Sequence, residues 1–224
     1  VDADATLRLL GTIACSGMLT GTPNGYIQWE EIIKVPATAS FNFFGTKEIL
    51  WIGNASLSGG GTLTNNWKID LRTGSKSIVE ATTLNNAYLL TATTSGALFI
   101  NDGTLNNLIS RKVGFFAAGG NVNHTGTAPH FFNNQGIIER RNNTGNAFIM
   151  ANLHNTGIIS VEDNSMLSLN YNGILLEGGI YNIAAGSNLR WQSTLTVKGN
   201  LNGTVHGVIT PTETFLVNPN APAF

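Results

Sequence analysis

The chain has 224 residues, which is enough for one domain with a sizeable core, because all-β folds of this length are often single units. Charged residues make up 11% of the sequence and the formal net charge is −1. This balance gives no electrostatic reason to expect nucleic acid or an anionic membrane as a partner. No segment approaches the roughly 18 uncharged apolar residues of a membrane helix, so no membrane insertion is expected.

The composition favours turns and β-structure over helix. The chain contains 26 glycines and 6 prolines and is rich in Asn and Thr. Gly and Asn tolerate left-handed backbone angles, and Thr favours strands. Cys15 is the one cysteine of the sequence, which rules out an internal disulfide and a cysteine-based metal cluster. We expect Cys15 to be a small buried residue.

The segment 1–48 does not show the repeat that follows it. The stretch YIQWEEIIKV at 26–35 places apolar residues among acids and ends before Pro36, so it fits either a short amphipathic helix or an edge strand. A protein built of stacked repeats needs a cap that covers its core and its unpaired strand edge. Residues 1–48 are therefore expected to form irregular first coils and an N-terminal cap.

From residue 49 onward, an apolar residue recurs two positions before an asparagine. The intervals between successive pairs are 21, 21, 27 and 21. In the later copies a glycine and two isoleucines follow, as NQGII at 134–138 and NTGII at 155–159, and looser copies are anchored at Leu175 and Val197. The pairs are Leu63 with Asn65, Leu84 with Asn86, Leu105 with Asn107, Phe132 with Asn134, and Leu153 with Asn155.

Between these pairs, a Gly or Ser leads into alternating apolar residues, as in SGALFI at 95–100, NSMLSL at 164–169 and GSNLRW at 186–191. This period of two indicates strands with one buried face. A unit of roughly 20–23 residues that holds only short strands becomes stable by stacking on copies of itself. The sequence therefore predicts an all-β fold, a parallel β-solenoid with coils of about 21 residues over 49–210. The expected winding is right-handed, although the spacing does not determine it.

The repeated pair predicts two structural roles. The apolar residue is expected to point into the core once per coil, and the asparagine to turn a corner. Its amide is then placed to bond the equivalent amides above and below, as in asparagine ladders. Residues 211–224, which contain three prolines, are expected to be a C-terminal cap or a linker.

The stretches FNNQGII at 132–138 and LHNTGIISVEDNSMLSLNYNGILLEGGIYNIAAGSNLRW at 153–191 resemble the degenerate repeats of large bacterial cell-surface adhesins and autotransporter-type passenger domains. The resemblance is clearest over residues 130–205 and weaker over 57–129. It implies a secreted or bacterial cell-surface location and an elongated β-helical scaffold that mediates adhesion or builds a surface structure. It does not specify a ligand.

Carboxylates are the candidates for catalysis, because β-helical polysaccharide lyases and glycoside hydrolases use acids that converge on one sugar. Seven positions after each anchor stand Asp70, Thr91, Lys112, Glu139 and Ser160. Asp70 and Glu139 would share a column three coils apart, roughly 14 Å at the usual strand spacing, which is too far for an acid–base pair. Glu162 and Asp163 are sequence neighbours, so on a strand they would point to opposite faces. We therefore predict a non-catalytic chain without cofactor or metal, with a polysaccharide-degrading enzyme as a distant alternative.

The longer interval, between Asn107 and Asn134, carries an insertion of about six residues, and insertions in solenoids map to loops on one face that often binds. The insertion lies in GGNVNHTGTAPHFF at 119–132. We expect it to form a loop within residues 114–131 that contacts a glycan or a protein. Its candidate residues are Asn121, Asn123, His124, Thr125 and His130. A metal site from the two histidines would need further ligands that the sequence does not indicate.

Two functions of different class follow from the predicted fold. The first is an extracellular adhesin or surface-scaffold module that displays loops for a glycan or protein ligand. The alternative is a subunit that self-associates into an extracellular filament, because open strand edges at solenoid ends template further pairing. Ice binding is not expected, because the threonine pairs do not recur once per coil. These pairs are Thr62/Thr64, Thr91/Thr93, Thr125/Thr127 and Thr194/Thr196.

Overall fold

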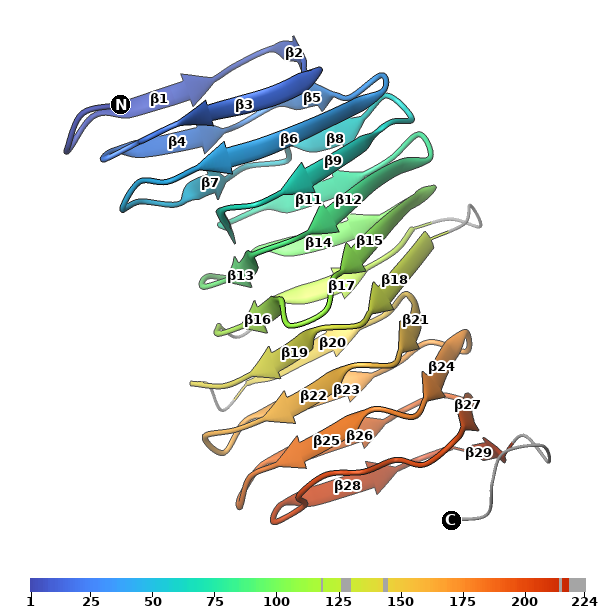
Figure 1. Ribbon diagram of the computed structural model, residues 1–224. Coiled ribbons are helices and arrows are strands. Elements are labelled where there is room, and N and C mark those ends of the chain that lie inside the picture. Colours follow the sequence, from blue (N-terminus) through green and yellow to red (C-terminus); the bar gives the residue numbers. More distant parts are fainter. Residues whose placement is uncertain (118, 126–129, 143–144, 214, 218–224) are drawn as a thin grey trace.

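The chain folds into one stack of coils made of strands and turns. The computed structural model describes residues 1–117, 119–125, 130–142, 145–213 and 215–217. Over these residues, 29 strands form three sheets in which neighbouring strands run parallel, and Figure 1 shows them winding along one axis. The predicted parallel β-solenoid is confirmed. No helix in this described part is long and apolar enough to cross a membrane.

Each full coil contributes one strand to each of the sheets A, B and C, in that order. Sheet A contains β1 (Thr6–Leu9), β4 (Tyr26–Trp29), β7 (Ile49–Trp51), β10 (Lys68–Leu71), β13 (Leu89–Ala92), β16 (Lys112–Phe115), β19 (Ile137–Arg140), β22 (Ile158–Val161) and β25 (Ile180–Ile183). Sheet B contains β2 (Thr12–Ala14), β5 (Ile32–Lys34), β8 (Ser56–Ser58), β11 (Ser75–Ile78), β14 (Ala97–Ile100), β17 (Asn121–Asn123), β20 (Asn146–Ile149), β23 (Met166–Leu169), β26 (Asn188–Trp191) and β28 (Val208–Pro211). Sheet C contains β3 (Gly17–Gly21), β6 (Thr38–Phe43), β9 (Thr62–Asn65), β12 (Thr82–Asn86), β15 (Gly103–Asn107), β18 (His130–Asn134), β21 (Asn152–Asn155), β24 (Ile174–Glu177), β27 (Leu195–Lys198) and β29 (Phe215–Val217).

The segment 1–48 continues the same three sheets towards the N-terminal end. The stretch at 26–35 forms β4 and β5, so the strand alternative applies there and the helix does not. In β6, Ala39 pairs with Leu63 and Phe41 pairs with Asn65. These coils therefore have different residue types at equivalent positions. For this reason the repeat is not visible in the sequence of this segment.

The core is a column of apolar side chains that runs inside the coils. Leu84 pairs with both Leu63 and Leu105, and all three are fully buried. Nearer the N-terminal end, the rings of Trp29 and Trp51 stack with centroids 3.9 Å apart. Cys15 is buried as expected, and this burial raises the pKa of its thiol.

The five asparagines of the repeated pairs form one continuous ladder inside the solenoid. Each side chain is fully buried, and each Nδ2 up to Asn134 donates to the Oδ1 of the next coil's asparagine. The four Nδ2–Oδ1 distances run from 3.2 Å at Asn65–Asn86 to 2.6 Å at Asn134–Asn155. The ladder ends where Asn155 Nδ2 donates to the hydroxyl of Tyr181 at 3.0 Å. Buried amides need such partners, because an unpaired one costs roughly 1–3 kcal/mol.

Lys76 is an exception to the apolar core, because its side chain is fully buried on the inward side of β11. Its Nζ donates to the carbonyl oxygens of Arg72, of Thr73 at 2.6 Å and of Gly74 at 3.1 Å. These carbonyls belong to the turn between sheets A and B, so Lys76 ties that turn to the core. Burial lowers the pKa of Lys76 from about 10.5 to about 8, because the charged ammonium loses its water.

This buried lysine predicts a pH dependence of stability. Between pH 8 and pH 10.5 the unfolded chain still holds a proton that the folded chain has released, so stability rises with pH across this window. We expect the free energy of unfolding of the unmodified chain to rise by about 1–2 kcal/mol more than that of Lys76→Met from pH 7.5 to pH 9.5. Urea denaturation of both proteins at both pH values measures this difference, in which the opposite contribution of the Cys15 thiol, whose pKa is raised by burial, cancels. Work below pH 10 avoids Tyr181, whose pKa is raised by burial and which acts in the opposite direction. Equal pH slopes in the two proteins would contradict the assignment.

Candidate functional site

The residues predicted to form a binding loop lie at the corner between sheets B and C. Asn121 and Asn123 belong to β17, and His130 begins β18. Residues 126–129 of the insertion lie outside the described residues. Asn121 Oδ1 accepts a hydrogen bond from the backbone N–H of Phe148 at 2.8 Å. This part of the insertion is therefore held by the next coil.

The two histidines of the insertion pack against each other. The rings of His124 and His130 are parallel, with centroids 4.0 Å apart, and Tyr171 presents its edge to both. His130 is only 3% exposed. Among the described residues, no three His, Cys, Asp or Glu side chains are grouped to hold a metal ion. The histidine pair therefore packs the corner, and of the predicted loop residues only Thr125 is exposed. Its N–H donates to Asn101 Oδ1 at 2.7 Å.

Asp70 and Glu139 lie in one outward column of sheet A, and one predicted member of that column is wrong. Gly114 pairs with both Thr91 and Glu139, so it takes the position expected for Lys112. The prediction placed each member of the column seven residues after its anchor. The turn after β15 is two residues longer than the corresponding turns, so Lys112 lies two positions earlier in its strand. Asp70 and Glu139 remain three coils apart.

Both carboxylates are neutralised locally. Asp70 forms an ion pair with Arg72 and accepts a hydrogen bond from Thr93 Oγ1 at 2.6 Å. Glu139 lies 2.8 Å from Lys112 Nζ and 3.4 Å from Arg141 Nε. The arrangement stabilises the outer face of sheet A and does not bring two acids together on one substrate.

The outer face of sheet C carries two regular columns that the sequence spacing did not reveal. One is a hydroxyl column in four successive coils, formed by Thr38, Thr62, Thr83 and Thr104. The other is an amide column two positions along each strand, formed by Asn85, Asn106 and Asn133. In the amide column, Asn106 Nδ2 donates to Asn85 Oδ1 and Asn133 Nδ2 donates to Asn106 Oδ1, both at 2.8 Å. The face is therefore a preformed, neutral array of donors and acceptors.

A groove lies beside the amide column at the corner between sheets C and A. Its first part has a volume of about 390 Å³ and is lined by Asn106, Asn133 and His154 and by Gln135 and Thr156, the last two of which are exposed at the corner. His154 Nε2 lies 2.7 Å from Glu177 Oε2 at the rim. Cavities of this size are in the range of small-molecule sites, about 300–1,000 Å³.

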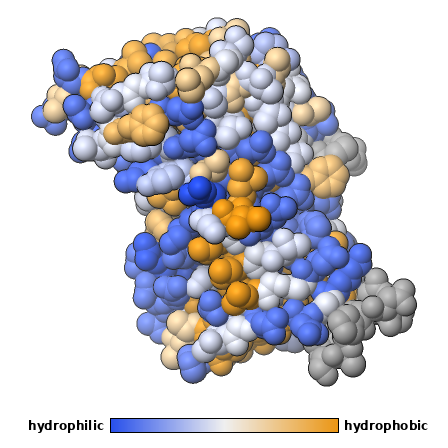
Figure 2. Space-filling model, viewed as in Figure 1, coloured by the Kyte–Doolittle hydropathy of each residue, from blue (hydrophilic) through white to orange (hydrophobic). Residues whose placement is uncertain are grey.

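The second part of the groove, of about 330 Å³, shares Gln135 and Thr156 with the first and has an apolar wall. This wall is the isoleucine stripe, formed by Ile109, Ile137, Ile158 and Ile180. Ile109 is 71% exposed and Ile180 is 41% exposed. Figure 2 shows apolar side chains gathered in a band down this face of the molecule. The two parts of the groove therefore adjoin at Gln135 and Thr156, one lined by amides and the other by aliphatic side chains.

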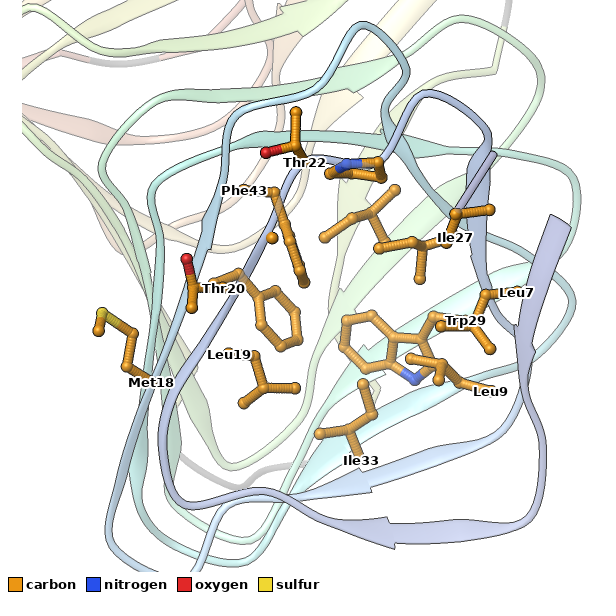
Figure 3. A pocket seen from close by; sticks show the side chains of 15 residues that line it. Leu7, Leu9, Met18, Leu19, Thr20, Thr22, Ile27, Trp29, Ile33 and Phe43 are labelled. Atoms are coloured by element: carbon orange, nitrogen blue, oxygen red, sulfur yellow. The ribbon is translucent and has the colours of Figure 1, made fainter. Parts of the chain in front are cut away.

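The N-terminal end of the solenoid holds a different, apolar hollow of about 500 Å³. Figure 3 shows Leu9, Leu19 and Trp29 turned into it from three strands of the first coils. Within the described residues, β1, β2 and β3 each pair with a neighbour on one side only. Among the described residues, this hollow lies at the N-terminal end of the core.

Another polar hollow, of about 280 Å³, is lined by residues that include Glu162, Asp163 and His206, so it differs from the corner groove in carrying carboxylates. The described lining residues of the corner groove include no Lys, Arg, Asp or Glu, so the groove suits reversible binding of an uncharged polar molecule. No protein-family model matches the chain, and no curated protein or solved structure matches it either.

Proposed function

We propose that the chain is a non-catalytic β-solenoid module of a bacterial surface or secreted protein that binds a neutral glycan in the corner groove. The observation that carries the proposal is that the pocket lined by the amide column adjoins the pocket lined by the isoleucine stripe, with Gln135 and Thr156 lining both. The extracellular location is supported by the resemblance of the repeats to those of surface adhesins.

A sugar matches the amide lining and the isoleucine lining chemically. Its hydroxyl groups need both donors and acceptors, and an asparagine amide supplies both. Its C–H faces are apolar and pack against aliphatic side chains such as Ile137 and Ile158. The uncharged lining gives an anionic polymer no cation to pair with, and it leaves a neutral ligand without a charge penalty.

This proposal predicts retention of neutral polysaccharides by the folded protein. On a panel of neutral, acidic and basic glycans, we expect binding to a neutral member, and we expect Asn133→Ala to weaken it about tenfold, since a lost or unpaired hydrogen bond costs roughly 1–3 kcal/mol. Isothermal titration calorimetry gives the affinities. The matched control is Asn66→Ala, because Asn66 also donates its Nδ2 to an outward asparagine, Asn42, but lies outside the groove. Failure of every neutral glycan to bind would overturn the proposal.

A filament subunit is the second candidate, and the open N-terminal end favours it. Unpaired edges beside an apolar hollow are a template for addition of further strands. Electron microscopy at high protein concentration would then show filaments with a regular axial repeat. Leu19→Lys places an inward charge at that end and should abolish them. Discrete monomers of the unmodified chain at the same concentration would exclude this candidate.

A further inference from the structure

The outer face of sheet C is regular and uncharged over four successive coils. Its strands β6, β9, β12 and β15 contain no Lys, Arg, Asp or Glu, and Figure 1 shows them side by side. They pair in register, so their outward side chains fall into straight columns. Two columns, which we call the hydroxyl–amide face, consist of Thr38, Thr62, Thr83 and Thr104 and, two positions along, of Ser40, Thr64, Asn85 and Asn106.

The spacing of this face is that of a rectangular lattice. Successive strands lie about 4.8 Å apart, and two outward positions of one strand lie about 6.6 Å apart. The hydroxyl column ends at the next coil, where Phe131 pairs with Thr104. The lattice therefore holds four rows of two polar side chains.

The side chains of the hydroxyl–amide face are ordered before a ligand arrives. Thr is β-branched and stiff at its first side-chain angle, so each hydroxyl and methyl group has a preset position. Asn106 Nδ2 donates to Asn85 Oδ1 at 2.8 Å, which fixes both amides. An amide has two N–H donors and two oxygen lone pairs, so each keeps hydrogen-bonding groups for a ligand. Such preorganisation lowers the entropy cost of binding.

We infer that the hydroxyl–amide face binds the surface of ice crystals. Oxygen atoms on a prism face of hexagonal ice also form a rectangular array, with one repeat close to the strand spacing and the other close to two residues along a strand. Each of these oxygens donates and accepts, as a hydroxyl group or an amide does. Ice has no charge and excludes ions, which suits a face without charged side chains. The inference concerns a second activity and does not rest on the proposed glycan binding.

The sequence-based expectation against ice binding counted pairs of threonines. On this face only Thr62 and Thr64 form such a pair, because the second position is Ser40 in β6 and an asparagine in β12 and β15. The single threonines of the other three coils were left out of that count. Strand pairing places one threonine per coil in the same column.

The small area of the hydroxyl–amide face disfavours a protein partner. Four strands and two columns at the spacings above cover roughly 300 Å², whereas a stable protein interface buries roughly 800 Å² on each partner. The face also offers a protein little of the apolar area that forms the core of an interface. A crystal lattice needs no such core, because it contacts every row at once.

The test is the growth of ice in a solution of the whole chain. We expect thermal hysteresis, in which crystals held just below the melting point do not grow, together with faceted crystals. Thr83→Lys places a long charged side chain at the centre of the face and should abolish both effects. Thr104→Lys repeats the test one coil further, in case the first variant does not fold. The matched control is Ser77→Lys, because Ser77 is a partly exposed, outward hydroxyl residue of sheet B, and it should keep the hysteresis.

The outcomes separate this inference from the proposed function. Absence of hysteresis and of faceting with the unmodified chain overturns the inference, while glycan binding is measured independently by calorimetry. Hysteresis that persists in folded Thr83→Lys and Thr104→Lys shows that ice binds elsewhere, which also overturns it. Size-exclusion chromatography covers self-association, because dimers that dissociate in Thr83→Lys would make this face a contact between copies and overturn the inference as well.

Discussion

Replacing Asn107 by alanine is expected to lower the free energy of unfolding by about 3–5 kcal/mol, because it opens a fully buried ladder. Asn107 Oδ1 accepts from Asn86 at 2.8 Å, and its Nδ2 donates to Asn134 Oδ1 at 2.7 Å and to the carbonyl oxygens of Arg111 and Ile137 at 3.2 and 3.1 Å. The alanine leaves these groups without one of their partners in a site closed to water and leaves a cavity as well. Loss of a single exposed hydrogen bond would cost far less.

The neighbouring residue supplies the control for this prediction. Asn106 has the same side chain and also bonds asparagines above and below, but it lies on the outer face and is partly exposed. Water replaces its partners when it is removed, so Asn106→Ala should cost no more than about 1 kcal/mol. Urea or guanidinium denaturation of both variants gives the difference. Equal losses for the two variants would mean that the buried ladder contributes nothing beyond ordinary surface hydrogen bonds.

The coil length and the inward columns are readable from the sequence because one coil is one repeat. Leu84 and Asn86 recur one coil later as Leu105 and Asn107, and the same burial acts on each copy. The pattern of letters is lost in the first coils, where Phe41 occupies the asparagine column. There, an apolar ring fills the inward position without an amide. The coil therefore keeps its shape although the residue type at this position differs.

The corner groove was not predicted, although part of its signal is visible in the sequence. Asn85 and Asn106 stand between each anchor leucine and the buried asparagine, a position that alternation assigns to the outer face. Because these stretches were interpreted as one motif, the outer column was missed. The isoleucine wall depends also on how each turn enters sheet A, and the longer turn before Lys112 shows that counting from an anchor does not locate that entry.

The predicted loop and the groove differ in their relation to the repeat. An insertion attracts attention because it breaks the repeat, yet His124 and His130 use their rings to fill a corner against Tyr171. The groove arises where the repeat is kept. Under the proposed function, the binding residues therefore belong to the regular face and not to the irregular segment.

The second large effect is expected at the glycine of the NTGII motif, because Gly157 lies where two coils approach closely. A Cβ at this position would lie 2.2 Å from the carbonyl oxygen of Gly136 and 2.7 Å from the carbonyl carbon of Gln135. Its φ is outside the left-handed region, so the requirement is for space and not for an unusual backbone angle. Backbone atoms of the adjacent coil do not move aside as a flexible side chain does.

Gly157→Ala is therefore expected to destabilise the fold by about 3 kcal/mol, the upper end for overpacking, whereas Gly21→Ala should change stability by less than about 0.5 kcal/mol. The control is matched, because the nearest atoms to a Cβ on Gly21 belong to the Phe43 ring at 3.8 Å and its φ is also ordinary. Thermal and chemical denaturation of both variants measure the difference. Gly157 also lines the second part of the groove, so the added methyl group should weaken the proposed glycan binding in the molecules that remain folded. If Gly157→Ala is as stable as Gly21→Ala, the coils are not held at this distance, and the motif's glycine needs another explanation.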